Sequence, residues 1–437
     1  MDIKTRNRIF YALCGVFIVA GTGLVFYAQG WRPDIATFEF KKVGGIYLKS
    51  FPSDAKIFLD GKYTDKKPGL LNRGRFIDNL FPKTYRLSLS KDGYLDWSEN
   101  IQVYPSLVSE IKYAILVPKK SVSAYDGYIK NFSVLNDWLI VSSGTALASG
   151  NSRLAGSHVL WQDQVSKSVF TENPAEKTYF VNYFSGSNET STPLNPKLNS
   201  FGINPRNIAE ITRDTGISGA AIFRTGTRIF SFNSQNGEIT QLIFSTSTIT
   251  QLGVSPSWIA WTTFDSAKGN SNLWFYWRPQ RSLQSKIELE GKTTRLSFSN
   301  KGDLGILQED GSFYIGKPGV KPEKTASDAK NFSFSDTGDT VSVLESQAIE
   351  IFSLTSEEGY WRFRISDAGR IEKLEWYADE NHLFVVYPEK IMFLDISDEG
   401  LENFLKAADG GQGHYDTQSN TLYFIKNNEL RKIFFPR

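Results

Sequence analysis

The sequence predicts a mainly β protein with an N-terminal transmembrane helix, a small β-sandwich and a β-propeller of about seven blades. Three observations lead to this fold class. Residues 9–28 carry no charge, and residues 45–118 alternate apolar and polar positions between short turns. In residues 122–437, similar strand patterns begin at residues 296, 332, 374 and 414. Aromatic residues form 14% of the 437-residue chain, which is typical of a folded protein with a large core.

Charge and cysteine content exclude several classes of function. The formal net charge is +2, so no global field attracts nucleic acid. Cys14 is the sole cysteine, which excludes an intrachain disulfide and a cysteine-ligated zinc site. The three histidines, His158, His382 and His414, form no pair with metal-ligand spacing. We therefore predict no cofactor and no nucleic-acid partner, and the scarcity of cysteine fits an exported bacterial protein.

The N-terminal helix is expected over 9-IFYALCGVFIVAGTGLVFYA-28. Twenty helical residues span about 30 Å, the thickness of a bilayer core. Lys4, Arg6 and Arg8 precede the segment, which predicts a cytoplasmic tail at residues 1–8 and an extracytoplasmic location for the bulk of the chain. A cleaved signal peptide and a buried globular helix are the alternatives, but the apolar stretch exceeds the 7 to 15 residues of a signal core. We expect an uncleaved signal anchor that crosses the cell membrane once.

A small sandwich is expected at residues 45–118, after a linker at residues 29–44. Apolar residues alternate in 45-GIYLKSFPSDAKIFLDGK-62, and Asp60-Gly61 is a hairpin turn signal. The same alternation recurs in 84-TYRLSLSKDGY-94, where Tyr85, Leu87 and Leu89 share one face. Two more strands are expected at 98–103 and 107–117, the second with an apolar face of Leu107, Ile111, Tyr113 and Ile115.

This segment resembles a PEGA domain, over about 75 residues. The stretch SFPSDAKIFLDG matches the opening of that family at Pro52, Ala55, Asp60 and Gly61, with Ser53-Asp54 in place of Glu-Gly. Further segments follow in the order of the family, namely Pro68-Gly69-Leu70 after Lys67, Leu80-Phe81-Pro82-Lys83-Thr84-Tyr85, Asp92-Gly93-Tyr94 and Trp97. The resemblance implies a non-catalytic module at the cell surface.

The repeated segments at the C-terminal end predict propeller blades. Each contains a short strand, a polar turn, an apolar strand, a tight break and a further strand. Blades usually take 40 to 45 residues, so the 316 residues from 122 to 437 predict about seven, with six or eight as alternatives. Stretches 142–157 and 185–200 are expected to be long surface loops, and 398-DEGLENFLKAA-408 a short helix.

Two turns strengthen the blade prediction. The segments from Phe298 to Asp303 and from Phe334 to Asp339 resemble the Phe-Ser-Pro-Asp-Gly turn of TolB-like and WD40-like propellers, without its proline. The resemblance implies the fold and specifies no partner.

No catalytic, metal-binding or ligand-binding residue is predicted. Asp303, Asp336 and Asp339 could form a calcium loop, but the spacing differs from an EF-hand and turn carboxylates are the favoured interpretation. His158 lies near Asp163 in sequence, without a Gly-x-Ser-x-Gly elbow. The segments 258-WIAW-261 and 273-LWFYW-277 could stack on sugars but are expected to pack between blades, and Tyr94 and Trp97 are weak ligand candidates.

These observations favour a membrane-anchored, non-catalytic envelope protein, in which a sandwich supports a propeller that binds a protein or a polysaccharide. The alternative is an envelope hydrolase that acts on a glycan or a peptide at the mouth of the propeller channel.

Overall fold

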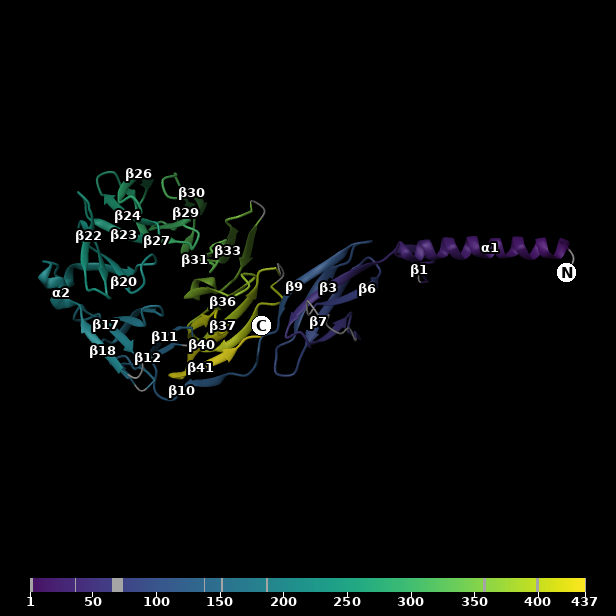
Figure 1. Cartoon of the computed structure of the whole chain (residues 1–437), viewed down its shortest axis with the longest axis horizontal. Helices are drawn as coiled ribbons and strands as arrows, with labels where there is room; N and C mark the ends of the chain where they lie inside the picture. Colours follow the sequence, from purple (N-terminus) through teal and green to yellow (C-terminus); the bar gives the residue numbers. More distant parts are fainter. Residues whose placement is uncertain are drawn as a thin grey trace. The chain divides into compact units, whose positions relative to one another are not determined.

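The computed structural model describes residues 3–35, 37–64, 74–136, 138–150, 152–185, 188–356, 359–397 and 401–436. The chain divides into two compact units, which are described separately below. Unit 1 comprises residues 1–120 with the last two residues, and unit 2 comprises residues 121–435. Figure 1 shows the helix and the sandwich of unit 1 and the many small sheets of unit 2.

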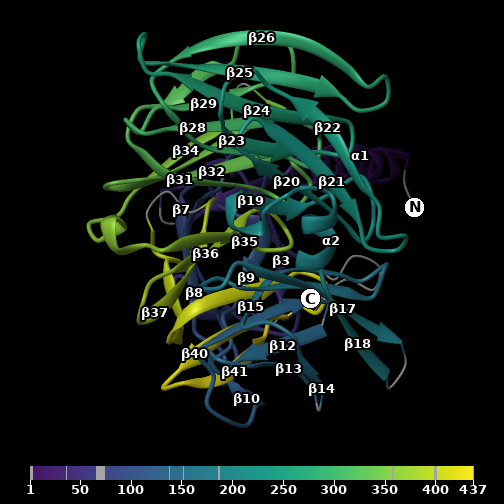
Figure 2. The same cartoon turned by 90° about the vertical axis from the view of Figure 1, so that its left-hand side faces the viewer.

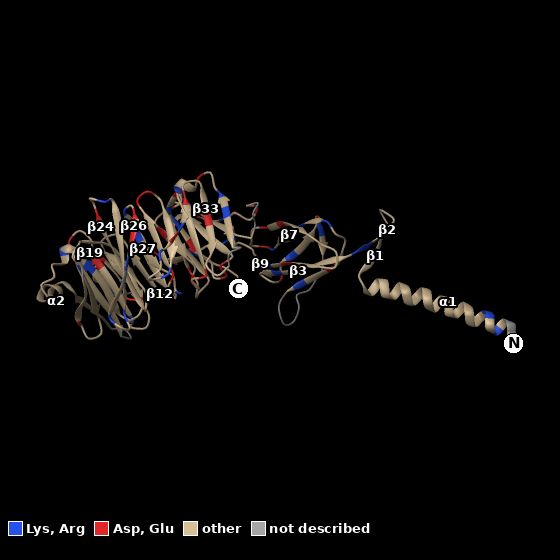
Figure 3. Ribbon diagram, turned by 90° about the horizontal axis from the view of Figure 1, so that it is seen from above, with Lys and Arg blue, Asp and Glu red and all other residues tan. Residues whose placement is uncertain are grey.

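Helix α1 (Ile3–Ala28) contains the predicted span and begins six residues earlier than expected. Its stretch from Thr5 to Ala28 is long and apolar enough to cross a membrane, and none of its most apolar window is buried against the described chain. Lys and Arg residues cluster at its first turns only, as Figure 3 shows. The apolar N-terminal helix is thus confirmed, whereas its location in a membrane stays a prediction.

The stretch expected as a linker contains a β-hairpin. Strands β1 (Trp31–Asp34) and β2 (Glu39–Lys42) pair in antiparallel register, with Trp31 opposite Lys42. Arg32 fixes the hairpin by donating hydrogen bonds to Tyr27 O (2.8 Å) and to Asn79 Oδ1 in the sandwich (2.9 Å). The stretch predicted as a linker, residues 29–44, therefore contains an ordered element held by polar contacts.

Two sheets form the predicted sandwich. One has the order β6-β3-β9 and the other β5-β4-β7-β8. The strands are β3 (Gly44–Phe51), β4 (Lys56–Leu59), β5 (Lys62–Thr64), β6 (Arg75–Leu80), β7 (Thr84–Ser90), β8 (Trp97–Gln102) and β9 (Val108–Ile115). Strands β3 and β9 run parallel, which requires the long connection through the second sheet.

Both sheets bury their apolar faces in one core. Tyr85, Leu87 and Leu89 are buried there as predicted, together with Trp97 of β8. The Asp60-Gly61 turn has positive φ at both residues (48° and 76°), as a tight hairpin requires. The predicted PEGA segment at residues 67–70 lies outside the described residues.

The predicted face of β9 is wrong in part. Ile111 and Ile115 are buried, but Tyr113 is exposed and Ala114 is buried in its place. Leu48 pairs with Ile111, whereas Ser50 pairs with Ala114, so β9 carries one extra residue. This bulge reverses the alternation, which a strict period of two could not anticipate.

Unit 2 contains eight four-stranded antiparallel sheets among its described residues. We number these blades 1 to 8 by their innermost strand. Blade 1 has β11 (Asn131–Leu135), β12 (Trp138–Ser142), β13 (Leu147–Ser149) and β14 (Ser152–Leu154); blade 2 has β15 (His158–Asp163), β16 (Ser168–Asn173), β17 (Thr178–Ser185) and β18 (Asn188–Pro193); blade 3 has β19 (Ile208–Arg213), β20 (Ala220–Thr225), β21 (Arg228–Asn233) and β22 (Ile239–Phe244); blade 4 has β23 (Ile249–Val254), β24 (Trp258–Asp265), β25 (Asn270–Trp277) and β26 (Ser282–Glu290).

Blades 5 to 8 repeat the same order. Blade 5 has β27 (Thr293–Phe298), β28 (Leu304–Gln308), β29 (Phe313–Gly316) and β30 (Glu323–Ala326); blade 6 has β31 (Ala329–Phe334), β32 (Thr340–Glu345), β33 (Ala348–Ser353) and β34 (Tyr360–Arg364); blade 7 has β35 (Lys373–Trp376), β36 (His382–Val386), β37 (Lys390–Asp395) and β38 (Leu405–Asp409); blade 8 has β39 (Gly411–Asp416), β40 (Thr421–Lys426), β41 (Glu429–Phe434) and, as its outer strand, β10 (Val122–Tyr125). Short helices α2 (Asn195–Ser200), η1 (Pro205–Asn207) and η2 (Ala368–Arg370) occupy connections between blades.

The blades form a closed, propeller-like ring: they follow one another around a centre in Figure 1, and Figure 2 shows the same ring from the side. Neighbouring blades contact one another in chain order, and β39 of blade 8 contacts β11 of blade 1. The predicted count of seven is therefore corrected to eight. A length of 45 residues per blade was too generous, because blade 1 is compact and blade 8 borrows its outer strand from the start of the unit.

A β-bulge recurs near the start of the inner strand in blades 2 to 6. The extra residue is Leu160, Ala209, Thr250, Thr294 or Lys330. The residue after each bulge is Trp161, Glu210, Gln251, Arg295 or Asn331. Bulges redirect the side chains that follow them, and two of these residues, Arg295 and Asn331, line one pocket.

Three further expectations are wrong. Stretch 142–157 contains β13 and β14, and stretch 185–200 contains β18 and α2, so neither is a long loop. Polar residues occupy these outer strands because one side faces solvent. The helix expected at 398–408 is replaced from residue 405 by β38, whose pairing with β37 overrides the helix-forming residues. Residues 398–400 lie outside the described part.

The closed ring predicts a large difference between two adjacent phenylalanines. Phe435 is 5% exposed and its ring lies 5.0 to 6.4 Å from those of Phe384, Phe393 and Tyr415, which join blades 7 and 8, whereas Phe434 is 55% exposed. We expect Phe435→Ala to lower the free energy of unfolding by about 3–5 kcal/mol and Phe434→Ala to change it by about 0.5 kcal/mol or less. Urea unfolding of the full chain in detergent measures both. Equal effects of the two substitutions would show that Phe435 does not seal the ring.

Candidate binding site in the central channel

The inner strands of the ring surround a central channel with polar walls. At the face that carries the turns between first and second strands, a cavity of about 540 Å³ opens. It is lined from several blades, by Arg213 of blade 3, Asn300 of blade 5, Asp336 of blade 6, Glu375 of blade 7 and His414 of blade 8, among others. We call this cavity the channel mouth. A second cavity of about 510 Å³ continues along blades 7, 8 and 1.

A carboxylate with two cationic neighbours lies at the centre of the channel mouth. Glu375 pairs with Lys373 of its own strand and, across the blade boundary, with His414 Nδ1 at 3.0 Å. The backbone N–H of Tyr415 donates to its other oxygen at 2.5 Å. Burial disfavours its charge, but the charges and hydrogen bonds of His414 and Lys373 prevail and lower the pKa of Glu375 to about 2.

His414 bridges blades 7, 8 and 1. Its Nδ1 faces Glu375, and its Nε2 lies 3.1 Å from the carbonyl oxygen of Val134. Two acceptors flank the ring, so the doubly protonated imidazolium satisfies both. Burial opposes this charge, but Glu375 prevails and raises the pKa of His414.

Asp163 anchors the opposite side of the mouth. Its carboxylate accepts hydrogen bonds from Ser166 N (3.0 Å), Gly219 N (3.1 Å) and Ser218 Oγ (2.9 Å), and it pairs with Arg213 at 3.2 Å. Burial raises its pKa, but these donors outweigh burial and bring the pKa to about 2. Arg213 is thereby held at the mouth with its side chain 42% exposed.

The residues weighed from sequence as catalytic or metal-binding do not come together. His158 and Asp163 occupy opposite ends of β15, and His158 Nδ1 lies 3.7 Å from Glu172 instead. Asp303 and Asp339 end the equivalent turns of blades 5 and 6, where Asp339 pairs with Lys301. Within the described ranges, no group of three or more His, Cys, Asp or Glu side chains could hold a metal ion.

The aromatic candidates are mainly structural. Trp261 is 3% exposed and lies 6.2 Å from Trp274 in a stacked pair, and Phe275 is buried in the core between blades 4 and 5. Trp258 and Trp277 stack at 5.8 Å and are partly exposed. Trp97 is 1% exposed in the sandwich core, so it is not a ligand-binding side chain.

Sequence reasoning missed the residues of the channel mouth. Lys373 immediately precedes the repeated segment that begins at residue 374, and Glu375 is the second residue of that segment. His414 is the first residue of the next repeated segment. Inner strands line the channel of a propeller. Polar residues at the start of each repeat could therefore have indicated the side chains that face the channel.

His382 is a buried imidazolium within blade 7. Its Nδ1 lies 2.9 Å from Asp379 and its Nε2 3.5 Å from Asp395, and its ring stacks on Phe393 at 4.8 Å. Burial lowers the pKa, but the two carboxylates prevail and raise the pKa of His382 to about 9.

This pair of ionic contacts predicts a pH-dependent stability. A pKa raised from 6.5 to about 9 on folding stabilises the protein fully below pH 6.5, and this contribution is lost as the pH rises through 9. We expect the free energy of unfolding of the wild type to exceed that of His382→Gln, and the difference to shrink by about 3 kcal/mol between pH 6 and pH 9.5. Urea titrations at each pH measure it. The half-exposed His158 provides the control, because His158→Gln should cost about 0.5 kcal/mol or less. A difference that stays constant with pH would contradict a charged His382.

Comparisons with known proteins give no family. No family model and no curated protein match the sequence, so the PEGA and TolB-like assignments stay predictions. Among solved structures, the chain is similar to a functionally unknown protein from Desulfotomaculum acetoxidans (8% identity, 60% of this chain and 90% of that chain, TM-score 0.40). It is also similar to Kluyveromyces lactis Hsv2 (13% identity, 61% and 89%, TM-score 0.40) and to that protein with loop 6CD replaced by a Gly-Ser linker (15% identity, 62% and 90%, TM-score 0.41). At these values, nothing known of those proteins is carried over to this chain.

Proposed function

We propose that this protein is a membrane-anchored, non-catalytic binding protein of a bacterial cell envelope, which recognises a protein or a polysaccharide at the channel mouth. The observation that carries the proposal is the channel mouth itself. It is a cavity of about 540 Å³ to which blades on several sides contribute charged and polar side chains. Ligand sites in proteins are concave and contain a small number of fixed polar groups, as this one does.

The fixed hydrogen bonds favour recognition over catalysis. Glu375 accepts from Lys373, His414 and the Tyr415 amide, and its pKa of about 2 makes it a weak base at neutral pH. His414 has an acceptor at each ring nitrogen, so its N–H groups donate to Glu375 and to the Val134 carbonyl oxygen rather than to a ligand. Groups held in this way suit a rigid recognition surface.

The helix supports an anchoring role. Residues 9–28 carry no charge, and the basic residues precede them, which favours a cytoplasmic N-terminus and an extracytoplasmic ring. The sandwich, which stands between helix and ring in the sequence, serves in this proposal as a PEGA-like spacer that keeps the binding ring away from the bilayer.

Removal of the anchor provides the test. We expect the full chain to sediment with membranes and to resist an alkaline carbonate wash, whereas residues 31–437 alone should remain soluble and keep a β-type circular-dichroism spectrum. The soluble fragment should retain envelope protein or polysaccharide from a cell-wall extract, and Glu375→Ala should reduce this retention. Release of the full chain by carbonate would overturn the anchor.

A hydrolase assay distinguishes the proposed binding protein from the alternative, an envelope hydrolase. The same fragment is incubated with envelope glycan and peptide substrates, and no turnover is expected. Turnover abolished by a single carboxylate or serine substitution would establish the hydrolase and overturn the proposal.

A further inference from the structure

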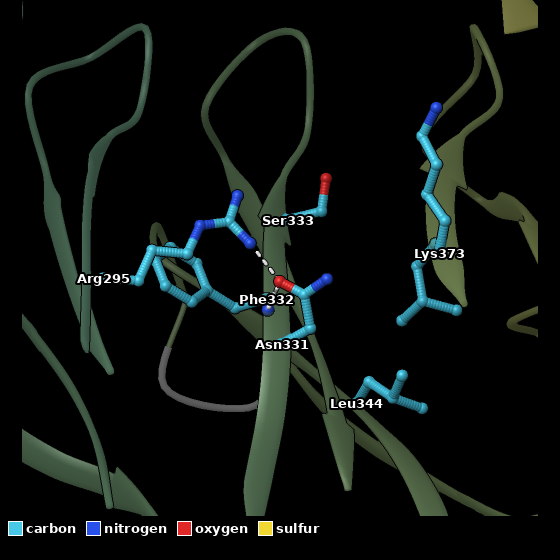
Figure 4. Close-up of a pocket in the computed structure, with 7 residues that line it drawn as sticks. Arg295, Asn331, Phe332, Ser333, Leu344 and Lys373 are labelled. Atoms are coloured by element: carbon cyan, nitrogen blue, oxygen red, sulfur yellow. Dashed lines mark hydrogen bonds between the residues drawn. The ribbon is translucent and has the colours of Figure 1, made fainter. Parts of the chain in front are cut away.

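A small pocket in the channel wall contains an arginine without an acidic partner. Arg295 of blade 5, Asn331, Phe332 and Ser333 of blade 6, and Lys373 of blade 7 line a cavity of about 110 Å³. Figure 4 shows Arg295 and Lys373 on opposite sides of this cavity, with Ser333 between them. We call it the Arg295 pocket. Its volume suits a single ionic group rather than a whole ligand.

Neighbouring side chains hold the Arg295 guanidinium in place. It donates to Asn331 Oδ1 and lies 4.7 Å from the centre of the Phe332 ring. Asn331 itself is fixed, because its Oδ1 also accepts from the backbone N–H of Phe332 at 2.9 Å. These contacts engage one edge and one face of the guanidinium, which has five N–H donors, so further donors remain for a ligand in the pocket that Arg295 lines.

The charge of Arg295 is not balanced locally. No carboxylate pairs with it among the residues that the structure describes, and it keeps an exposed surface toward the channel. The surrounding wall removes part of its hydration, which lowers the pKa of Arg295. A partly desolvated cation without a counter-ion gains from an incoming anion.

The nearest acid does not neutralise the pocket. Glu375 faces both Lys373 and His414, so one carboxylate serves two cationic groups. Glu372 and Asp336 line the adjoining cavities and not this one. Among the described residues, the Arg295 pocket itself is therefore lined by two cationic side chains, Arg295 and Lys373, and by no acidic one.

We propose that the Arg295 pocket binds an oxyanion group, a carboxylate or a phosphate, with Arg295 as its main donor and Lys373 and Ser333 as supporting donors. Arginine matches carboxylate and phosphate oxygens with two parallel N–H groups. This inference rests on the proposed binding function and names the chemistry of its ligand. The group comes either from a free small anion or from an acidic polysaccharide.

Two probes distinguish these sources. The full chain in detergent is titrated calorimetrically with inorganic phosphate and, separately, with polygalacturonate, a carboxylated polysaccharide. We expect at least one probe to bind, and Arg295→Gln to weaken that binding at least tenfold. Phosphate binding alone identifies a free anion, polymer binding alone identifies a polymer-borne carboxylate, and either result supports the pocket.

Matched variants keep the proposal falsifiable. Lys330→Gln removes one positive charge at the bulge beside Asn331, outside the pocket, and should leave binding within twofold of the wild type. Ser333→Asp places an internal carboxylate in the pocket and should abolish binding even if Arg295→Gln does not fold. The proposed anion site is contradicted if neither probe binds, or if Arg295→Gln and Lys330→Gln lose the same amount of binding affinity. If the soluble fragment still retains envelope material in that case, the proposed binding function stands without an anion site in the Arg295 pocket.

A second inference rests on the hairpin that follows helix α1. Ile35, Phe38 and Phe40 are 80%, 91% and 66% exposed, although the hairpin begins only three residues after the apolar helix ends. The hairpin contacts the helix, since Arg32 lies 3.7 Å from the centre of the Tyr27 ring. Exposed aromatic side chains beside cations are characteristic of the membrane interface.

We infer that the β1–β2 hairpin lies in the headgroup region of the bilayer that α1 crosses. Lys42 borders the apolar residues and can reach lipid phosphates, whereas Lys41 pairs with Asp34 at 2.8 Å within the hairpin. Arg32 couples the hairpin to the sandwich through Asn79. The hairpin then fixes the sandwich at the membrane surface in addition to the helix. This inference rests on the anchoring part of the proposed function.

Lipid quenching tests the depth of the hairpin. In a Cys14→Ser full chain, an environment-sensitive fluorophore is attached to Ile18→Cys, Phe38→Cys or Lys56→Cys, and the chain is reconstituted with brominated lipids. Lys56 lies beyond the far end of β3, an eight-residue strand of roughly 26 Å. We expect quenching of at least 40% at positions 18 and 38 and below 10% at position 56. Quenching at position 18 without quenching at 38 overturns this inference alone, and no quenching at 18 overturns the anchor as well.

Discussion

Closure of the ring is the constraint on which the rest of unit 2 depends. Blade 8 is built from both ends of the unit, because β10 pairs with β41 while β39 to β41 come from the C-terminal end. Blades 8 and 1 are joined by polar contacts as well, since Asn136 N donates to Asp416 Oδ1 at 3.2 Å and His414 lies against Val134. Loss of β10 would leave β41 as an unpaired sheet edge, whereas the contact between β39 and β11 closes the channel wall.

Closure also explains why the charged residues of the channel mouth lie where they do. Lys373 and Glu375 belong to β35 of blade 7 and His414 to β39 of blade 8, and only adjacent inner strands bring Glu375 and His414 within hydrogen-bond distance. The shared carboxylate ties blade 7 to blade 8, and the imidazolium continues the chain of contacts to blade 1. The same groups thus stabilise the seam and present charge to the channel, so we expect a substitution there to affect the proposed binding and the stability together. Arg295 differs, because it lies away from the seam and its charge serves no described ion pair.

How much could be predicted depended on the range of the interactions. Alternation over a few residues identified β7, whose face of Tyr85, Leu87 and Leu89 is buried as expected, and the four C-terminal repeats begin at or beside inner strands. Pairing with distant strands decided the rest. β38 is a strand because β37 lies beside it, and the eighth blade exists because β10 returns to β41. The channel mouth was missed for the same reason, since Glu375 and His414 are 39 residues apart in sequence.

The two anchoring elements of unit 1 have a mechanical consequence for recognition. A helix alone leaves the attached sandwich free to rotate about the helix axis and to tilt on its short connection. Arg32 holds the hairpin to the helix end and, through Asn79, to the sandwich. In the anchoring that we propose, the hairpin adds a second point of attachment at the membrane surface. Two attachments would restrict the sandwich to fewer orientations, and a base that is already restricted loses less entropy when a ligand is bound. Under the proposed function, in which the partner is fixed in the cell envelope, a restricted base therefore favours affinity without any new contact in the channel.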